Sequence, residues 1–254
     1  MLAVAVLVTV LGATGCAGPV FENDSCVQPD GGEDFRSADC TEPGALRVLD
    51  VRSQSEFCRD IPAVTTVYQD WDDSHKYCLG PPDADPTTAI NTAQLGDCAY
   101  TEGDGRSHVR VDCADPAAQL QVLHRVEGYA VALNECASVP GTTVEYEWRL
   151  DGKGGLAQLS LDNIYFCFGP AGVDPQTFVE LARPGDCIAE TGATPEWVIV
   201  GCSAPEVAYR VHGRADGWAA AVTACQDTPA ATMRLMENGR GPMQEPFTLC
   251  LGPL

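Results

Sequence analysis

The sequence predicts an α+β, mainly β fold made of three small disulfide-stapled repeat modules, each with about five strands and one short helix. Three observations predict it. The cysteines recur in sets of four at matched spacings, turn signals fall midway between paired cysteines, and intervening segments alternate apolar and polar residues as half-buried strands do. A module of this size has a marginal core, so two disulfides would supply much of its stability.

The composition limits where the chain works and what it binds. Thirteen cysteines in 254 residues predict an oxidising, exported setting, because reducing compartments keep thiols free. The formal net charge is −21, from 15 Lys plus Arg against 36 Asp plus Glu. Such a chain repels phosphate backbones and anionic lipid, which argues against nucleic acid as a partner and against membrane attachment by charge.

The first fifteen residues carry no charge and lead to a cysteine. The apolar run MLAVAVLVTV is followed by small residues and then Cys16. We expect residues 1–15 to be a lipoprotein signal peptide, Cys16 to be the lipidated first residue of the mature chain, and residues 16–25 to be a short tether. The alternatives are a plain secretory signal and a transmembrane anchor, for which this run is shorter than the ~20 residues needed.

The other twelve cysteines form three sets of four: Cys26, Cys40, Cys58, Cys78; Cys98, Cys113, Cys136, Cys167; Cys187, Cys202, Cys225, Cys250. In each set the second cysteine precedes a proline by three residues and an arginine by twelve. The third precedes a proline by four and a threonine by seven, and the fourth opens CLGP or CFGP. We therefore expect modules at 26–81, 95–170 and 185–254, joined by linkers PPDADPTTAINTAQ and PAGVDPQTFVELARP.

Turn positions favour one disulfide pattern. Four cysteines allow three pairings. In the second set the midpoint of Cys98 and Cys113 falls in a GDG turn, and that of Cys136 and Cys167 falls on Asp151-Gly152, a hairpin signal. The first set has its second turn at 70–74. We therefore predict first-to-second and third-to-fourth bridges in every module, between directly opposed hairpin residues, whose Cβ spacing suits a disulfide.

The remaining elements follow from local pattern. VEYEWRL (144–150) alternates Val, Tyr, Trp and Leu with Glu and Arg, which predicts a half-buried strand. LQVLHRV (120–126) and AYRVHGR (208–214) predict one more strand between the hairpins. GWAAAVTAC (217–225) predicts a short helix. The aromatic residues on these strands are interpreted as core rather than as a sugar-stacking platform: Tyr68, Trp71, Tyr146 and Trp148.

The pattern Gly-Asp-Cys, Cys-x2-Pro, Cys-x3-Pro and Cys-[Leu/Phe]-Gly-Pro, read together with the export signal, resembles the LppU-like lipoproteins of actinobacteria. It is more loosely similar to the septum-formation family of the same bacteria. The resemblance covers all three modules. It implies a location on the outer face of the cell membrane, and it brings no established activity or catalytic residue.

Motifs for chemistry are missing from the sequence. It has no Cys-x-x-Cys, Gly-x-Ser-x-Gly, P-loop or HExxH, so we expect no catalytic residue, metal or cofactor. The four histidines are interpreted as structural or exposed. The carboxylates are so numerous that a glycosidase-like pair is neither supported nor excluded. The acidic loops at 70–73 and 83–85 are interpreted as solvated rather than as Ca²⁺ sites.

Arg52, Arg125 and Arg214 are the recurring polar positions outside the cysteine framework. One interpretation makes them ligand contacts for an anion or carboxylate on each module. The other, which we prefer, is an internal ion pair with Asp97 or Asp186.

These observations favour a lipid-anchored, extracytoplasmic, non-enzymatic lipoprotein that binds an envelope protein or a cell-wall component. Repeated modules would allow more than one contact at once. The alternatives are an envelope hydrolase acting on glycans or peptides, and a purely structural lipoprotein without a ligand.

Overall fold

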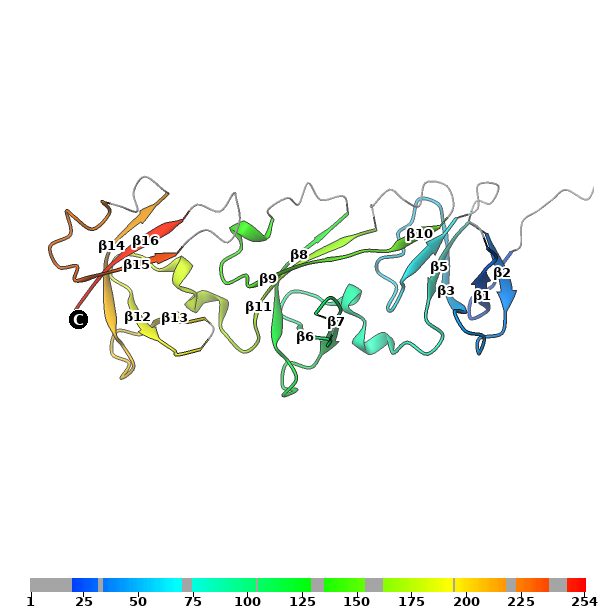
Figure 1. Cartoon of the computed structure of the whole chain (residues 1–254), viewed down its shortest axis with the longest axis horizontal. Coiled ribbons are helices and arrows are strands. Elements are labelled where there is room, and N and C mark those ends of the chain that lie inside the picture. Colours follow the sequence, from blue (N-terminus) through cyan, green and yellow to red (C-terminus); the bar gives the residue numbers. More distant parts are fainter. Residues whose placement is uncertain are drawn as a thin grey trace, which may run out of the picture.

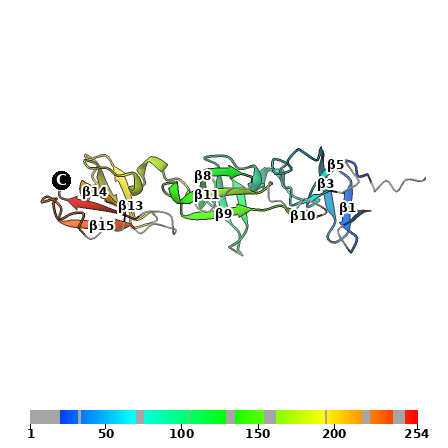
Figure 2. The same cartoon turned by 90° about the horizontal axis from the view of Figure 1, so that it is seen from above.

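A computed structural model describes residues 20–31, 34–69, 75–103, 105–128, 135–153, 162–193, 195–217, 223–237 and 246–254. Three β-sheets follow one another along the long axis, and the C-terminus lies at the end opposite the first sheet (Figures 1 and 2). The predicted signal peptide and Cys16 lie outside the described residues.

The first sheet has the strand order β10-β4-β5-β3-β1-β2. Its own strands are β1 (Cys26–Pro29), β2 (Phe35–Ala38), β3 (Leu46–Ser53), β4 (Thr66–Tyr68) and β5 (His75–Gly80). Its sixth strand, β10 (Asp151–Lys153), comes from the range predicted for the second module. Asp151-Gly152 is therefore not the predicted hairpin turn, because this segment runs on beyond its own sheet and pairs with β4.

The other two sheets share one order, β7-β6-β8-β11-β9 and β13-β12-β14-β16-β15. The second contains β6 (Cys98–Thr101), β7 (His108–Val111), β8 (Leu120–Glu127), β9 (Val144–Trp148) and β11 (Ile164–Pro170). The third contains β12 (Cys187–Glu190), β13 (Trp197–Val200), β14 (Tyr209–Asp216), β15 (Met233–Glu237) and β16 (Phe247–Gly252). The mainly β prediction is confirmed.

The helices of the described residues are 3-10 helices of three residues each. They are η1 (Pro86–Thr88), η2 (Ile90–Thr92), η3 (Cys136–Ser138), η5 (Pro175–Thr177) and η6 (Val179–Leu181). Two of them, η1 and η2, lie in the first predicted linker, and η5 and η6 lie in the second. The side chains of Asp85 and Asp174 cap η1 and η5. The prediction of one short helix per module is not confirmed, and residues 218–222 of GWAAAVTAC lie outside the described residues.

Six disulfides join first to second and third to fourth cysteines, as predicted: Cys26–Cys40, Cys58–Cys78, Cys98–Cys113, Cys136–Cys167, Cys187–Cys202 and Cys225–Cys250. The bridged residues are not directly opposed. Cys98 lies opposite Val111, and Cys113 follows two residues later, where the chain turns at Asp112. The turn brings the Cα atoms of the two cysteines to 5.0 Å, which a disulfide accepts.

The glycine of CLGP and CFGP has a steric reason in every module. A Cβ atom at Gly252 would lie 2.1 Å from the carbonyl oxygen of Ala230, and one at Gly80 would lie 2.4 Å from that of Ala63. Each of those carbonyls directly follows the proline of Cys-x3-Pro. The two motifs therefore recur together because the loop after the third cysteine packs against the strand of the fourth.

The recurring threonine fastens the same loop. The backbone N–H of Thr65, Thr143 and Thr232 donates to the carbonyl of the residue after the fourth cysteine, at 2.8, 2.7 and 2.7 Å. Disulfide, glycine contact and hydrogen bond thus hold one loop against one strand, and we call this set the loop–strand contact.

The turn before the first cysteine also has one geometry in all modules. Gly96 and Gly185 adopt φ values of 90° and 102° and donate to Val122 and Val211. The first module has Asp24 at this position, with φ 66° and a bond to Val48. Asp tolerates the left-handed region better than most residues, so the first module keeps the turn without the glycine.

The core is continuous between the first two modules. One buried cluster contains Cys58, Val64 and Val67 of the first module together with Trp148 and Phe166 of the second. Separate clusters lie within the first and third modules. Tyr68 and Trp148 are 2% and 8% exposed, and Tyr146 packs on the shared cluster, which confirms the core interpretation; Trp71 lies outside the described residues.

We predict that Gly252→Ala destabilises the protein by about 1–3 kcal/mol, because the new methyl group would overlap the Ala230 carbonyl and the His212 ring. The matched control is Gly201→Ala in the same module, where no atom lies within 4 Å of the new Cβ. Thermal unfolding followed by circular dichroism measures both. Equal melting temperatures for the two variants would contradict the close approach.

Candidate functional site

The three recurring arginines have internal partners. Arg52 donates to Asp50 at 2.9 Å and to Asp60 at 2.7 Å. Arg125 pairs with Glu127, and Arg214 lies 2.9 Å from Asp216. The preferred interpretation, an internal ion pair, describes this arrangement, but the predicted partners were wrong. Each arginine uses a carboxylate two residues away on its own strand, and the ligand-contact interpretation stays a prediction.

Asp97 and Asp186 are engaged elsewhere. Asp97 accepts from the backbone N–H of Gln94 at 2.9 Å and lies 3.3 Å from Arg110. Asp186 accepts from the N–H of Arg183 at 2.7 Å. Both carboxylates therefore close the end of a linker, so neither serves the recurring arginines.

Arg125 and Arg214 also fasten the linkers. Arg125 donates to the carbonyl of Asn91 at 3.3 Å. Arg214 donates to the carbonyls of Glu180 and Ala182 at 2.7 and 3.0 Å. The guanidinium carbons lie 6.0 and 4.6 Å from the ring centres of Phe166 and Phe247. These two side chains, 15% and 24% exposed, join β8 and β14 to the linkers that precede their modules.

Arg52 repeats in the sequence but not in the strand register. The strands β3, β8 and β14 each contain a β-bulge. Arg125 and Arg214 lie two residues after the bulged residue of their strands, opposite Phe166 and Leu249. In the first module that position belongs to Val51, and Arg52 lies one residue further, opposite Lys76. Desolvation acts to lower the pKa of Arg52, but Asp50 and Asp60 outweigh it and raise the pKa, so the guanidinium stays charged.

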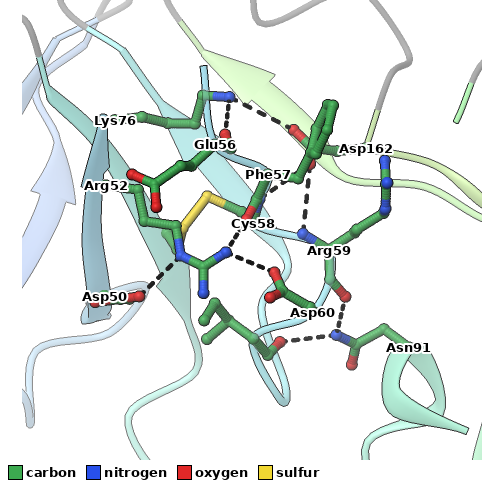
Figure 3. Close-up of polar contacts among 12 residues, drawn as sticks. Asp50, Arg52, Glu56, Phe57, Cys58, Arg59, Asp60, Lys76, Asn91 and Asp162 are labelled. Carbon is green, nitrogen blue, oxygen red and sulfur yellow. Dashed lines mark hydrogen bonds and ion pairs between the residues drawn. A yellow bond between two sulfur atoms is a disulfide. The ribbon is translucent and has the colours of Figure 1, made fainter. Parts of the chain in front are cut away.

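The junction between the first two modules is a dense polar contact (Figure 3). Asp162, next to β11, accepts from the backbone N–H groups of Cys58 and Arg59 at 3.0 and 3.4 Å. Lys76 lies 4.0 Å from the same carboxylate and donates to the carbonyl of Glu56 at 2.6 Å. Because Asp162 belongs to the second module and the others to the first, these contacts hold the modules together.

Asn91 is the most buried polar residue of this junction, with 1% of its surface exposed. Its amide nitrogen donates to the carbonyls of Arg59 and Ile61 at 2.8 and 2.7 Å, and its side-chain oxygen accepts from the N–H of Ala63 at 3.3 Å. Asn91 therefore satisfies three backbone groups of the loop between Cys58 and Ala63. Sequence reasoning missed it, because a single asparagine in a Pro- and Thr-rich linker carries no signal for burial.

The junction between the second and third modules uses different residues. Glu180 takes the position of Asn91, seven residues before the first cysteine of its module. Ala137 takes the position of Arg59, so the Arg59–Glu127 ion pair of 3.0 Å has no counterpart there. Phe178 lies at this junction and is 1% exposed. Its ring packs directly against Gly141, because a Cβ atom added there would lie 2.0 Å from the ring. The second junction thus contains an aromatic ring packed against a glycine.

The described carboxylates with shifted pKa values are all shifted downward. Hydrogen bonds from Thr41 lower the pKa of Asp39, and bonds from Ser53 lower that of Glu56. At Glu147 burial acts to raise the pKa, but bonds from Arg149, Tyr165 and Asn163 outweigh it and lower the pKa. A glycosidase acid needs a raised pKa, so these groups do not fit that role.

The histidines that the structure describes in detail have structural or surface positions. His108 is 8% exposed and meets the Tyr146 ring edge-on at 4.4 Å. His124 is partly exposed and lies 4.0 Å from Glu135. In the described ranges, no group of three or more His, Cys, Asp or Glu side chains could hold a metal ion.

Three further findings concern membrane-spanning helices, the disulfides and the comparisons with known proteins. Among the described residues, no helix has the length and apolar content needed to cross a membrane. The six disulfides indicate an oxidising, extracytoplasmic environment. No family model, curated protein or solved structure matches this chain.

We predict that Asn91→Asp destabilises the protein by about 2–3 kcal/mol, because a carboxylate would face the carbonyls of Arg59 and Ile61 without a donor. The control, Gln94→Glu, makes the same amide-to-acid change at an exposed position of the same linker. Urea unfolding compares the two. A loss of stability no larger for Asn91→Asp than for Gln94→Glu would show that Asn91 does not hold the junction.

We predict that Glu147→Gln lowers the free energy of unfolding at pH 7 by about 0.5–1 kcal/mol. The folded pKa of Glu147 is lowered, so its contribution is present above the unfolded value and is lost as the pH falls through the folded pKa. The difference from wild type should therefore shrink toward pH 3. Melting temperatures between pH 7 and pH 3 measure it, with the exposed Glu145→Gln as control. A difference that is constant with pH would refute the assignment.

Proposed function

We propose that the chain is a lipid-anchored, extracytoplasmic lipoprotein without enzymatic activity that binds another envelope protein or a cell-wall component. The observation that carries this proposal is that the recurring residues serve the framework. The cysteines, glycines and threonines form the loop–strand contact, and Arg125 and Arg214 fasten the linkers. The residues that the three modules share are therefore structural. Three modules in a row present several surfaces on which a partner could bind.

The resemblance to the LppU-like lipoproteins supports the same proposal, because it implies a location on the outer face of the membrane. The disulfides support an exported chain. The alternative of an envelope hydrolase finds no support in the downward pKa shifts of the described carboxylates. The alternative of a purely structural lipoprotein differs only in lacking a partner, so the experiment must test partner binding directly.

We predict that the wild-type protein enters the detergent phase of a membrane extract, with a lipid-modified Cys16 as its first residue, and that Cys16→Ser leaves the detergent phase. Mass spectrometry of the mature N-terminus and phase partitioning measure this. A mature chain that begins elsewhere and carries no lipid would contradict the anchor.

Partner binding is tested by affinity capture from crosslinked cells, with the Cys16→Ser chain as a control for proximity. We expect one envelope component to be retained by the wild type at a constant ratio. Retention of nothing would favour the purely structural lipoprotein. Release of sugars or peptides from purified cell wall by the wild type would favour the hydrolase.

A further inference from the structure

In the first two modules the following linker packs against the loop after the third cysteine. Asn91 of the first linker binds three backbone groups of that loop, which belong to Arg59, Ile61 and Ala63. Glu180 of the second linker lies in the wall of a hollow at the matching loop. Asn91 and Glu180 each lie six residues after the aspartate of an Asp-Pro-x-Thr pattern. The loop is therefore a surface on which a segment of this pattern binds, and we call it the linker-binding loop.

The third module presents its linker-binding loop in an open form. Its third cysteine, Cys225, is partly exposed, whereas Cys58 and Cys136 are buried. A hollow of about 370 Å³ lies at the loop, and it is lined by Cys225, Gln226, Ala231, Thr232, Met233 and Arg234. The hollow of the second module, which Glu180 helps to line, encloses about 100 Å³. Most lining residues of the two hollows lie at the same distances from the third cysteine, so the hollows are equivalent.

The backbone of the loop differs between the modules as well. Five residues after the third cysteine, Ala63 and Gly141 adopt φ values of 63° and 78°. Ala230 holds this position in the third module, but among the described non-glycine residues only Asp24 and Ala63 have a positive φ. The left-handed region costs an alanine free energy, and the hydrogen bond from the Ala63 N–H to Asn91 opposes that cost. We therefore associate the left-handed conformation with a bound linker.

The same position selects the segment that fits. At Gly141 a Cβ atom would lie 2.0 Å from the ring of Phe178 in the second linker. Ala230, like Ala63, carries a Cβ atom, and the first linker has Ala89 where the second has Phe178. The third module should therefore bind a segment like the first linker in preference to one like the second.

We propose that the linker-binding loop of the third module binds a segment of another envelope protein with the pattern Asp-Pro-x-Thr-Ala-apolar-Asn. Its aspartate would cap a 3-10 turn, as Asp85 does. Its asparagine amide would meet the backbone groups that match those bound by Asn91, which belong to Gln226, Thr228 and Ala230. The inference rests on the proposed function and names the surface and the chemistry of the partner.

The N-terminal segment of this chain does not carry that pattern. Counted back from the first cysteine, Ala13 and Pro19 stand where the first linker has Asp85 and Asn91. The two linkers that do carry Asp-Pro-x-Thr already contact the loops of their own chain. We therefore assign the segment to another protein rather than to a second copy.

The probe is a capped synthetic peptide with the sequence of residues 85–93, DPTTAINTA. Titrated into the isotope-labelled full chain, it should give saturable 1:1 binding, with chemical-shift changes centred on residues 225–234. The first two loops keep their own linkers, because a covalently attached segment has a high effective concentration. The peptide with Asn91→Ala should bind at least tenfold more weakly, because it lacks the amide that meets the loop.

An exchange of peptides tests the selectivity. The sequence of residues 174–182, DPQTFVELA, should bind wild type at least tenfold more weakly than DPTTAINTA, because its phenylalanine would overlap the side chain of Ala230. Ala230→Gly removes that side chain and should raise the affinity for DPQTFVELA at least tenfold.

A matched pair of variants locates the site. Ala231→Gln places a larger side chain in the hollow and should weaken the binding of DPTTAINTA at least tenfold. Ala208→Gln makes the same change at an exposed position of the same module and should bind within about twofold of wild type. Mass spectrometry of the six disulfides and melting curves verify that each variant is folded.

Three results would overturn the inference: shift changes away from residues 225–234, no saturable binding of DPTTAINTA by folded wild-type protein, or equal binding by folded Ala231→Gln and Ala208→Gln. A concentration-dependent dimer that Ala231→Gln abolishes would assign the loop to a second copy and would also overturn it. A cellular partner that is captured equally by wild type and Ala231→Gln would leave the proposed function standing and remove this surface from it.

Discussion

The fold of each module depends on the contact between the loop of the third cysteine and the strand of the fourth. A disulfide, a glycine without a side chain and a threonine N–H hold that loop at one place. A core of this size is marginal, and a bridge closing a loop of this length adds about 3 kcal/mol in the chain-entropy model. The strand of the fourth cysteine is thereby held in place, and it pairs with the strand that precedes the loop of the third cysteine.

The motif residues form contacts within each module, so the contacts between modules are made by other residues. The two junctions differ in these residues. The first junction combines Asn91, Asp162 and the strand β10, which the second module adds to the first sheet, and its buried core is continuous. The second packs Phe178 into a notch that Gly141 leaves open. One framework therefore supports two junctions built from different residues within the same chain, and each holds the modules in a row.

Much of the fold could be predicted from the sequence because its signals are local. The pairing of Cys98 with Cys113 and of Cys187 with Cys202 follows from turns at hairpin midpoints, and the strand at Val144–Trp148 follows from alternation. The role of β10 could not be predicted, because Asp-Gly is a turn signal and the strand it meets lies in another module. Propensity describes a segment and does not identify a distant partner.

The polar contacts were harder to predict than the strands for a related reason. Equal spacing from the second cysteine suggested that Arg52 matches Arg125 and Arg214. The residue that pairs with the first cysteine, however, follows the second cysteine by seven residues in the first module (Arg47) and by eight in the others (Gln121 and Arg210). A shift of one residue exchanges the faces of a strand, so Arg52 meets other neighbours. Asn91 gave no signal, because its burial depends on the packing of two modules.

The measurement that tests this account most directly is peptide mapping of the native protein under non-reducing conditions. The account predicts six bridges, each within one module and each joining first to second or third to fourth cysteine. A bridge between modules, or free thiols among these twelve cysteines in the native protein, would contradict it.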